Sequence, residues 1–306
     1  MKRWAAFILV VFFALGGSLA LAAAPVAILW PKPLEAFQGD LLEVRVDGDE
    51  LLAVDGMLGK EKVYFSANVK TPFTALIGID VEAKPATVKL LLKATVSGGQ
   101  SQQREIPLRI KSKAYRQESF NVPPSFDQMS PETLAEIRRE QADFARAFAV
   151  TAAERWWQLP FVRPVPQEAS ASSFGSRRII NGVPRAPHTG TDLSAPAGTE
   201  VVAVNHGKVV LVGNYFFAGG SVVLDHGGGL YSMYFHLSEF KVEEGALVRR
   251  GDVLALSGGT GRVTGPHLHW GMRLNNTRVD PLVLLRKFSS PTESGDVNKA
   301  SVKAEK

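Results

Sequence analysis

Short runs in which apolar and polar residues alternate constrain the fold of this 306-residue chain more than any other feature. Between residues 26 and 112 such runs recur with turn residues between them, as where Val44 and Val46 flank Arg45. Because neighbouring side chains of a strand point to opposite faces, period-two patterning predicts strands with one buried face. Short strands at this spacing are typical of a small antiparallel β-sandwich. We therefore expect an accessory β-sandwich domain over 26–112. This segment has no histidine and no apparent catalytic group of residues, which favours a role as a spacer or binding module.

Residues 113–165 are predicted to form a helical linker. Ser130 is a suitable N-cap, Pro131 fits the first helical turn, and Glu132 lies near the positive end of the helix dipole. An apolar stripe follows at spacings of three and four residues: Leu134, Ile137, Phe144 and Phe148. Burying each such side chain contributes about 1.5–3 kcal/mol. We therefore expect an amphipathic arm that packs against one or both domains.

Residues 166–288 differ from the rest of the chain in composition. They hold 18 of the 28 glycines and all six histidines. Apolar runs such as residues 208–212 and 221–224 are punctuated by glycines at turns, which predicts antiparallel hairpins. The expected fold class is mainly β: an N-terminal antiparallel β-sandwich, an amphipathic helical linker and a C-terminal glycine-rich antiparallel β domain. Residues 289–306 are predicted to form a polar, disordered tail.

The N-terminus has the layout of a secretory signal peptide over residues 1–22. A basic start precedes an apolar run over residues 4–15, and an A-x-A cleavage signal ends at Ala22. The alternative is an uncleaved membrane anchor, since residues 4–24 are nearly long enough to span a bilayer. Glycines interrupt this run where a cleavage region would begin, which favours the signal peptide. We expect no integral membrane span once the signal is removed.

Cysteine content and charge limit the classes of function. The chain has no cysteine, which excludes a disulfide framework and a lipid-modified N-terminal cysteine. The formal charge of +5 falls to +3 if Lys2 and Arg3 leave with the signal (5 − 2 = 3). That balance suits an anionic cell envelope and falls short of a nucleic-acid-binding pattern. We expect an exported protein of a bacterial periplasm or cell envelope that binds no nucleic acid.

Five side chains in the last segment could form one chemical site. His267 and His269 lie one residue apart in "GPHLHW" and would share a face of a strand; His188 and Asp192 border a turn, and His236 completes the set. Imidazole nitrogens and carboxylate oxygens are ordinary zinc ligands, and a catalytic zinc takes three protein ligands with one open position. Spacing alone leaves open which three would bind metal. The other two histidines, each followed by glycine, are interpreted as turn residues: His206 and His226.

The motifs around these residues resemble, in order and approximate spacing, those of the lysostaphin-type (LytM-like) zinc metallopeptidases, which are bacterial cell-wall endopeptidases. The similar segments are "SFGSR" at 173–177, "PHTGTD" at 187–192, "YFHLS" at 234–238 and "GPHLH" at 265–269. The resemblance covers about the last 40% of the chain. It implies a zinc metallopeptidase domain of the duplicated hybrid motif type over 166–288. It also implies one Zn²⁺ per chain, held by His188, Asp192 and His269, with His236 and His267 as the catalytic pair.

The resemblance implies an exported zinc metalloendopeptidase that hydrolyses peptide bonds in peptidoglycan stem peptides or cross-links. A direct cross-link is favoured over a pentaglycine bridge as the scissile site. One alternative is a non-catalytic member that binds or activates other cell-wall hydrolases, although such members typically lose ligand residues. Another alternative is an exported protease acting on proteins. The N-terminal domain and the arm could also regulate the peptidase domain within the same chain.

Overall fold

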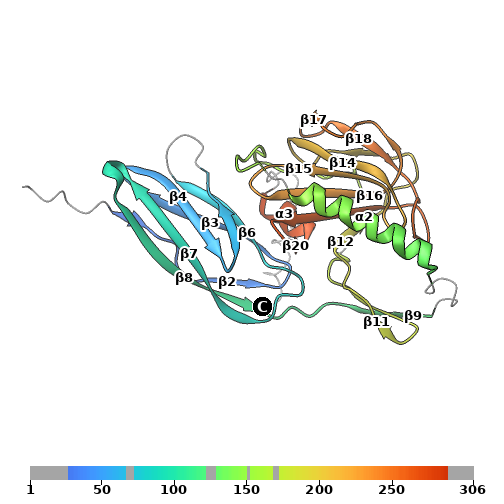
Figure 1. Ribbon diagram of the computed structural model, residues 1–306, viewed down its shortest axis with the longest axis horizontal. Coiled ribbons are helices and arrows are strands. Elements are labelled where there is room, and N and C mark those ends of the chain that lie inside the picture. The colour runs from blue at the N-terminus through green and yellow to red at the C-terminus, as the bar shows by residue number, and fades with distance from the viewer. Residues whose placement is uncertain (1–26, 67–71, 122–128, 150–151, 168–171, 289–306) are drawn as a thin grey trace, which may run out of the picture.

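The computed structural model describes residues 27–66, 72–121, 129–149, 152–167 and 172–288 (Figure 1). The expected signal peptide and polar tail lie outside these residues. Strands of the first half are β1 (Ile28–Leu29), β2 (Leu34–Phe37), β3 (Leu41–Gly48), β4 (Leu51–Leu58), β5 (Glu61–Tyr64), β6 (Phe73–Gly78), β7 (Ala86–Val96), β8 (Ser101–Lys111) and β9 (Gln117–Phe120). After helix α2 (Pro131–Ala149) come β10 (Arg177–Ile180), β11 (Val183–Pro184), β12 (Gly190–Leu193), β13 (Glu200–Val202), β14 (Gly207–Tyr215), β15 (Gly219–Asp225), β16 (Leu230–Phe240), β17 (Leu247–Val248), β18 (Val253–Ser257), β19 (Leu268–Leu274), β20 (Thr277–Val279) and helix α3 (Pro281–Phe288).

The structure confirms the mainly β class. Among the described residues, the strand pairs are antiparallel except for β2 with β8 and β9 with β10, which run parallel. Both parallel pairs join segments far apart in the sequence, so local alternation could not indicate their direction. Within the described ranges, neither helix combines the length and apolar character needed to cross a membrane.

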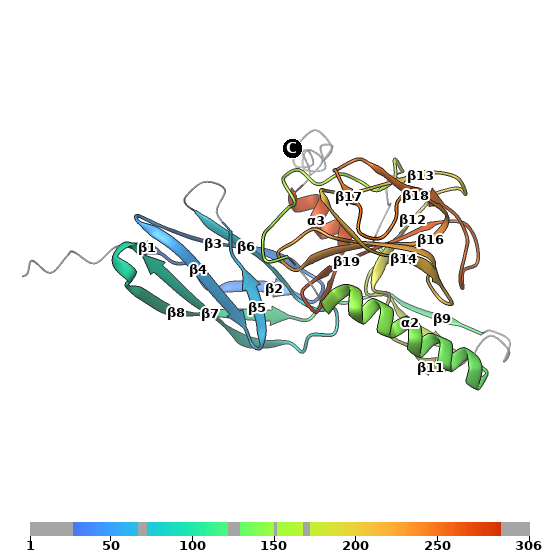
Figure 2. The ribbon, with the colours of Figure 1, turned by 45° about the horizontal axis from the view of Figure 1, so that its top comes forward.

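The first segment forms two sheets packed on each other (Figure 2). One has the strand order β2-β8-β7-β4-β5, and the other has the order β1-β3-β6. Their inward side chains are those that the period-two pattern predicts, and they form one buried cluster that includes Val44, Val46, Leu90, Leu92, Ile106 and Leu108. The apolar residues of the alternating pattern are therefore the ones buried between the two sheets.

Helix α2 begins where the sequence predicts. The Ser130 hydroxyl accepts a hydrogen bond from the Thr133 backbone N–H (3.2 Å), as an N-cap should. Its last two turns pack on the C-terminal domain, where Ala147 is buried and both Phe144 and Phe148 cover apolar side chains of the sheet. Leu134, at the other end, remains exposed. The predicted amphipathic arm therefore packs through its C-terminal half.

The C-terminal sheet has nine strands, with β12-β19-β16-β15-β14-β17 as its main path. Alternate residues of β16 point to different environments: Tyr234 belongs to the main apolar core with Trp270, while Tyr231 and Met233 belong to a second cluster with Leu211. Helix α2 covers the second cluster, so one face of this sheet is partly closed by the arm (Figure 1).

The sandwich docks firmly on the C-terminal domain. The guanidinium of Arg278, in β20, donates two hydrogen bonds to the Asp80 carboxylate (3.0 and 2.7 Å). A methyl group at Gly78 would come 2.3 Å from the Thr277 hydroxyl, so β6 and the β19–β20 hairpin lie in close contact. Leu41 of the sandwich belongs to the main apolar core of the C-terminal domain. The two parts are therefore joined by both ion pairing and apolar burial.

His226 differs from the interpretation as a simple turn residue. It follows β15 directly, yet it is fully buried. Its Nδ1–H donates to the His206 carbonyl (2.7 Å), and its Nε2 bonds the Ser232 hydroxyl (2.7 Å), which in turn bonds the Tyr234 hydroxyl. The Tyr234 hydroxyl also accepts from the Val204 N–H (3.1 Å), so both ring nitrogens of His226 and this tyrosine are held by hydrogen bonds inside the core.

This buried histidine predicts a loss of stability in mild acid. Burial lowers the pKa of His226 to about 4, against the pull of its hydrogen bond to His206. The unfolded chain, with an ordinary histidine pKa near 6.5, then binds the proton more tightly, so stability is complete above about pH 6.5 and falls as pH drops toward 4. We expect His226 to remove about 1.4 kcal/mol of unfolding free energy per pH unit in that window.

Denaturant unfolding of the unaltered protein and of the His226→Gln variant, compared across the window, measures this contribution. The unaltered protein should lose stability more steeply as the pH falls, because glutamine takes no proton. Parallel pH profiles for the two proteins would contradict the assignment.

Candidate metal centre

Three potential ligands meet at the edge of the C-terminal sheet. Asp192 in β12 and His269 in β19 are cross-strand partners, and His188 lies just before β12. Asp192 Oδ1 lies 3.0 Å from His269 Nδ1 and 3.2 Å from His188 Nε2, and the two nitrogens are 2.9 Å apart. A tetrahedral zinc with bonds of about 2.0–2.1 Å would hold its donors about 3.3 Å from one another. The spacing of these three atoms is therefore close to that of a zinc ligand set.

The proton arrangement at this triad also fits a metal. The Ser173 carbonyl can only accept, so it takes the Nδ1–H of His188 (3.1 Å) and leaves Nε2 as the bare lone pair that faces the other donors. Both histidines are buried. Three electron-rich atoms facing one another in a buried place repel unless a cation or a shared proton lies between them. The donor set thus matches Zn²⁺ in type, number and spacing.

The local electrostatics favour the protonation states that a metal requires. Burial alone would raise the pKa of Asp192, but its interactions with the neighbouring imidazoles of His188 and His269 outweigh burial and hold the pKa of this carboxyl far below its usual range. Burial lowers the pKa of His269, with the Asp192 carboxylate opposing that effect. An ionised carboxylate beside a neutral imidazole is the form in which both groups coordinate metals.

His236 and His267 lie next to the triad. Their ring centroids are 4.8 Å apart, and Nε2 of His267 is 3.7 Å from Asp192 Oδ1. Each ring donates its Nδ1–H to a backbone carbonyl, His236 to Thr260 (3.0 Å) and His267 to Gly265 (2.9 Å). Both Nε2 atoms therefore carry lone pairs that can accept a proton. Burial is the main cause that lowers the pKa of His236 to about 4, so this ring is neutral near pH 7.

An irregular strand turns His236 toward the site. Phe235, its neighbour in β16, pairs with His269 across the sheet, so a regular strand would send His236 to the opposite face. The β15–β16 register is irregular between Gly220 and Val222, and His236 has φ 66°, a left-handed conformation unusual for a residue with a side chain. Its N–H is held by the Ala218 carbonyl (2.9 Å). Local sequence carries no signal for this reorientation.

The five predicted site residues line one open groove of about 640 Å³. The structure thus brings all of them together, and the same groove is also lined by residues that sequence analysis did not identify, among them Asn121, Arg178, Ile180, Phe217, Phe235, Arg262 and Val263. Arg178 Nη2 lies 3.9 Å from Asp192 Oδ2 and adds positive charge beside the triad. Asn121 and Arg178 reach the groove through the parallel β9–β10 pair, which no local pattern indicates.

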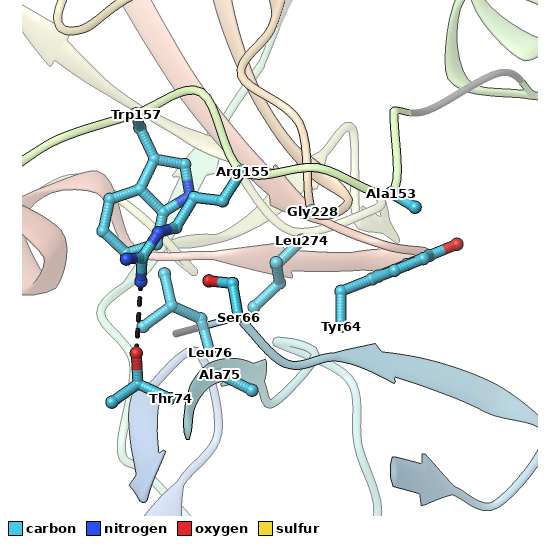
Figure 3. Close-up of a pocket in the computed structure, with 10 residues that line it drawn as sticks. All are labelled: Tyr64, Ser66, Thr74, Ala75, Leu76, Ala153, Arg155, Trp157, Gly228 and Leu274. Atoms are coloured by element: carbon cyan, nitrogen blue, oxygen red, sulfur yellow. Dashed lines mark hydrogen bonds between the residues drawn. The ribbon is translucent and has the colours of Figure 1, made fainter. Parts of the chain in front are cut away.

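A second hollow lies between the sandwich and the C-terminal domain (Figure 3). Its walls include Tyr64 and Thr74 from the sandwich and Arg155 and Trp157 from the linker, and the Arg155 guanidinium donates to the Thr74 hydroxyl (3.1 Å). With a volume of about 10 Å³ it has room for roughly one water. Of these two hollows in the described part of the chain, the groove beside the histidines is the one large enough for a peptide.

The profile described as peptidase family M23 matches residues 186–281, which contain all five site residues. Peptidoglycan DD-endopeptidase ShyA of Vibrio cholerae is 42% identical over 113 residues, which are 37% of this chain and 26% of ShyA. DD-carboxypeptidase/endopeptidase Mpg of Neisseria meningitidis is 40% identical over 120 residues, 39% of this chain and 27% of Mpg. The chain spans about a quarter of the length of these curated relatives.

A solved structure extends the similarity beyond the matched segment. The crystal structure of a Pseudomonas aeruginosa protein assigned to peptidase M23 is 32% identical, with a TM-score of 0.64. The alignment covers 84% of this chain and 97% of that protein, so it reaches well past the C-terminal domain. On the combined evidence of the matched segment, the grouped site residues and this nearly complete alignment, the chain belongs to peptidase family M23.

Proposed function

We propose that the protein is an exported zinc metalloendopeptidase that hydrolyses peptide bonds in peptidoglycan stem peptides or cross-links. The observation that carries the proposal is the meeting of His188, Asp192 and His269 donors at 2.9–3.2 Å beside two further histidines with free Nε2 atoms. The names of ShyA and Mpg supply the substrate class, and "DD-endopeptidase" favours a direct cross-link. The signal-like N-terminus supports a site of action in the periplasm or cell envelope.

Each site residue has a chemical task in this proposal. His188, Asp192 and His269 would hold one zinc ion, which supplies Lewis acidity toward water and toward a peptide carbonyl. His267 and His236 each offer Nε2 to take a proton from the attacking water and return it to the leaving amine. Once protonated, the same rings stabilise negative charge that develops on the carbonyl oxygen. The histidine pair thus serves where many zinc peptidases use a glutamate.

Digestion of defined muropeptides tests the proposal. Zinc-loaded protein should split directly cross-linked dimers into monomers, detected by mass spectrometry, and a chelator should stop the reaction until zinc is restored. Pentaglycine-bridged peptides and an unfolded protein such as casein serve as matched substrates and should remain intact. Faster cleavage of casein would make the enzyme a general protease. Intact dimers, with stimulation of a separate wall hydrolase, would make it a non-catalytic activator.

A further inference from the structure

One face of the C-terminal sheet is shared between helix α2 and the proposed metal centre. Tyr231, Met233 and Phe235 alternate along β16 and point to this face, and His269 of the neighbouring β19 points to it as well. Helix α2 covers the part of the face formed by β14, β15 and β16, and the groove occupies the part beside β12 and β19. Phe235 lies at the boundary, because it belongs both to the cluster under α2 and to the groove lining.

The rings at this boundary form a continuous chain from the helix to the metal ligand. Phe235 stacks on His269 with 5.4 Å between ring centroids and 8° between planes. Phe144 of α2 meets Phe235 edge to face, with centroids 5.7 Å apart and planes at 81°. Phe144 also contacts Tyr215 at 4.8 Å. Both the stacked and the edge-to-face arrangements are favourable geometries for aromatic pairs.

The ring of His269 depends on packing for its orientation more than the ring of His188 does. His188 is anchored by the Ser173 carbonyl on the nitrogen that faces away from the triad. In the described part of the chain, no hydrogen bond reaches the corresponding Nε2 of His269. That ring is instead enclosed by Phe235 on one face and by the backbone of Gly190, where a methyl group would come 2.4 Å from Nε2.

We propose that Phe235 and Phe144 are positioning residues for His269, so that helix α2 helps to fix the ligand geometry of the metal centre. The inference rests on the proposed zinc site and extends it to residues 131–149, outside the segment that matches the family profile. Phe235 limits rotation of the ligand ring, and Phe144 prevents Phe235 from turning away. Outer residues that orient a metal ligand commonly change metal affinity by about 10–100-fold when they are altered.

Zinc affinity of the full mature chain, measured by competition with a chromogenic chelator, tests this role without using catalysis. Phe235→Leu should weaken zinc binding by roughly tenfold or more, and Phe144→Ala should weaken it several-fold in the same direction. Phe144→Leu keeps apolar volume while it removes the ring edge, and it provides a second variant if Phe144→Ala folds poorly. Cobalt-substituted protein should show a changed absorption spectrum in the variants that weaken zinc binding, which records altered ligand geometry.

Phe148→Ala is the matched control. Phe148 lies one turn further along the same helix and packs on Tyr231 (5.2 Å between centroids), away from the triad. The Phe148→Ala variant should lower the Tm about as much as Phe144→Ala does, but it should change zinc affinity less than about twofold. Equal losses of affinity in the Phe144 and Phe148 variants, or unaltered affinity in Phe235→Leu, would overturn the proposal. If the unaltered chain binds zinc but cleaves no muropeptide, only the proposed activity fails; if it binds no zinc, the positioning role fails with the site.

Discussion

Replacing either His236 or His267 by alanine is expected to leave zinc and fold in place while turnover falls at least about a hundredfold. Both Nδ1–H groups are fixed by backbone carbonyls, so both Nε2 atoms are directed to the groove as acceptors. Neither ring contributes a donor to the close triad of His188, Asp192 and His269. The loss should therefore appear in the chemical step and not in the metal content.

The measurement is the rate of dimer cleavage at saturating substrate, together with zinc content. His236→Asn is a useful second variant, because asparagine tolerates the left-handed backbone of this position better than alanine does. His206→Ala is the control, since His206 belongs to the same domain but lies outside the groove lining. Near-normal rates in both site variants would remove the histidine pair from the mechanism and leave the fold assignment intact.

Much of the fold follows from local pattern. The alternation around Val44, Leu90 and Ile106 predicts which side chains enter the sandwich core, because a strand exposes alternate residues to opposite faces. Ser130 predicts the start of α2 because an N-cap satisfies a backbone N–H at the next turn. These features depend on residues within a few positions of each other, so the sequence displays them directly.

The parts of the site that could not be predicted depend on contacts between distant segments. The β9–β10 pair joins residues about sixty positions apart and brings Asn121 and Arg178 to the groove, and nothing in either short segment indicates its partner. The direction of His236 depends on a register irregularity and a positive φ. Phe235 gives no signal of its own, because a buried aromatic residue beside a histidine is ordinary until the stacking geometry is known.

Alanine at His188, Asp192 or His269 is expected to strip most of the zinc from the chain and to abolish peptide cleavage. The unaltered mature protein should carry about one zinc per chain, since three ligands define one catalytic site. Structural zinc in zinc-finger peptides binds with about 10–16 kcal/mol; on that scale, losing one of three donors removes about a third of the binding free energy, which corresponds to a several-hundredfold or greater loss of affinity. Asp192→Ala should have the largest effect because it also removes the only negative charge of the triad.

Metal analysis after dialysis against a weak chelator measures this loss, and circular dichroism checks that each variant remains folded. His267→Ala serves as the matched control, because it removes an imidazole from the same strand face while leaving the close triad intact.

The comparison of these two variants also decides which of the two neighbouring histidines, His267 or His269, is the metal ligand. Nε2 of His267 lies 3.7 Å from Asp192 Oδ1, whereas Nδ1 of His269 lies 3.0 Å from it. Full zinc in His269→Ala with zinc lost in His267→Ala would transfer the ligand role to His267 and leave His269 as the proton acceptor.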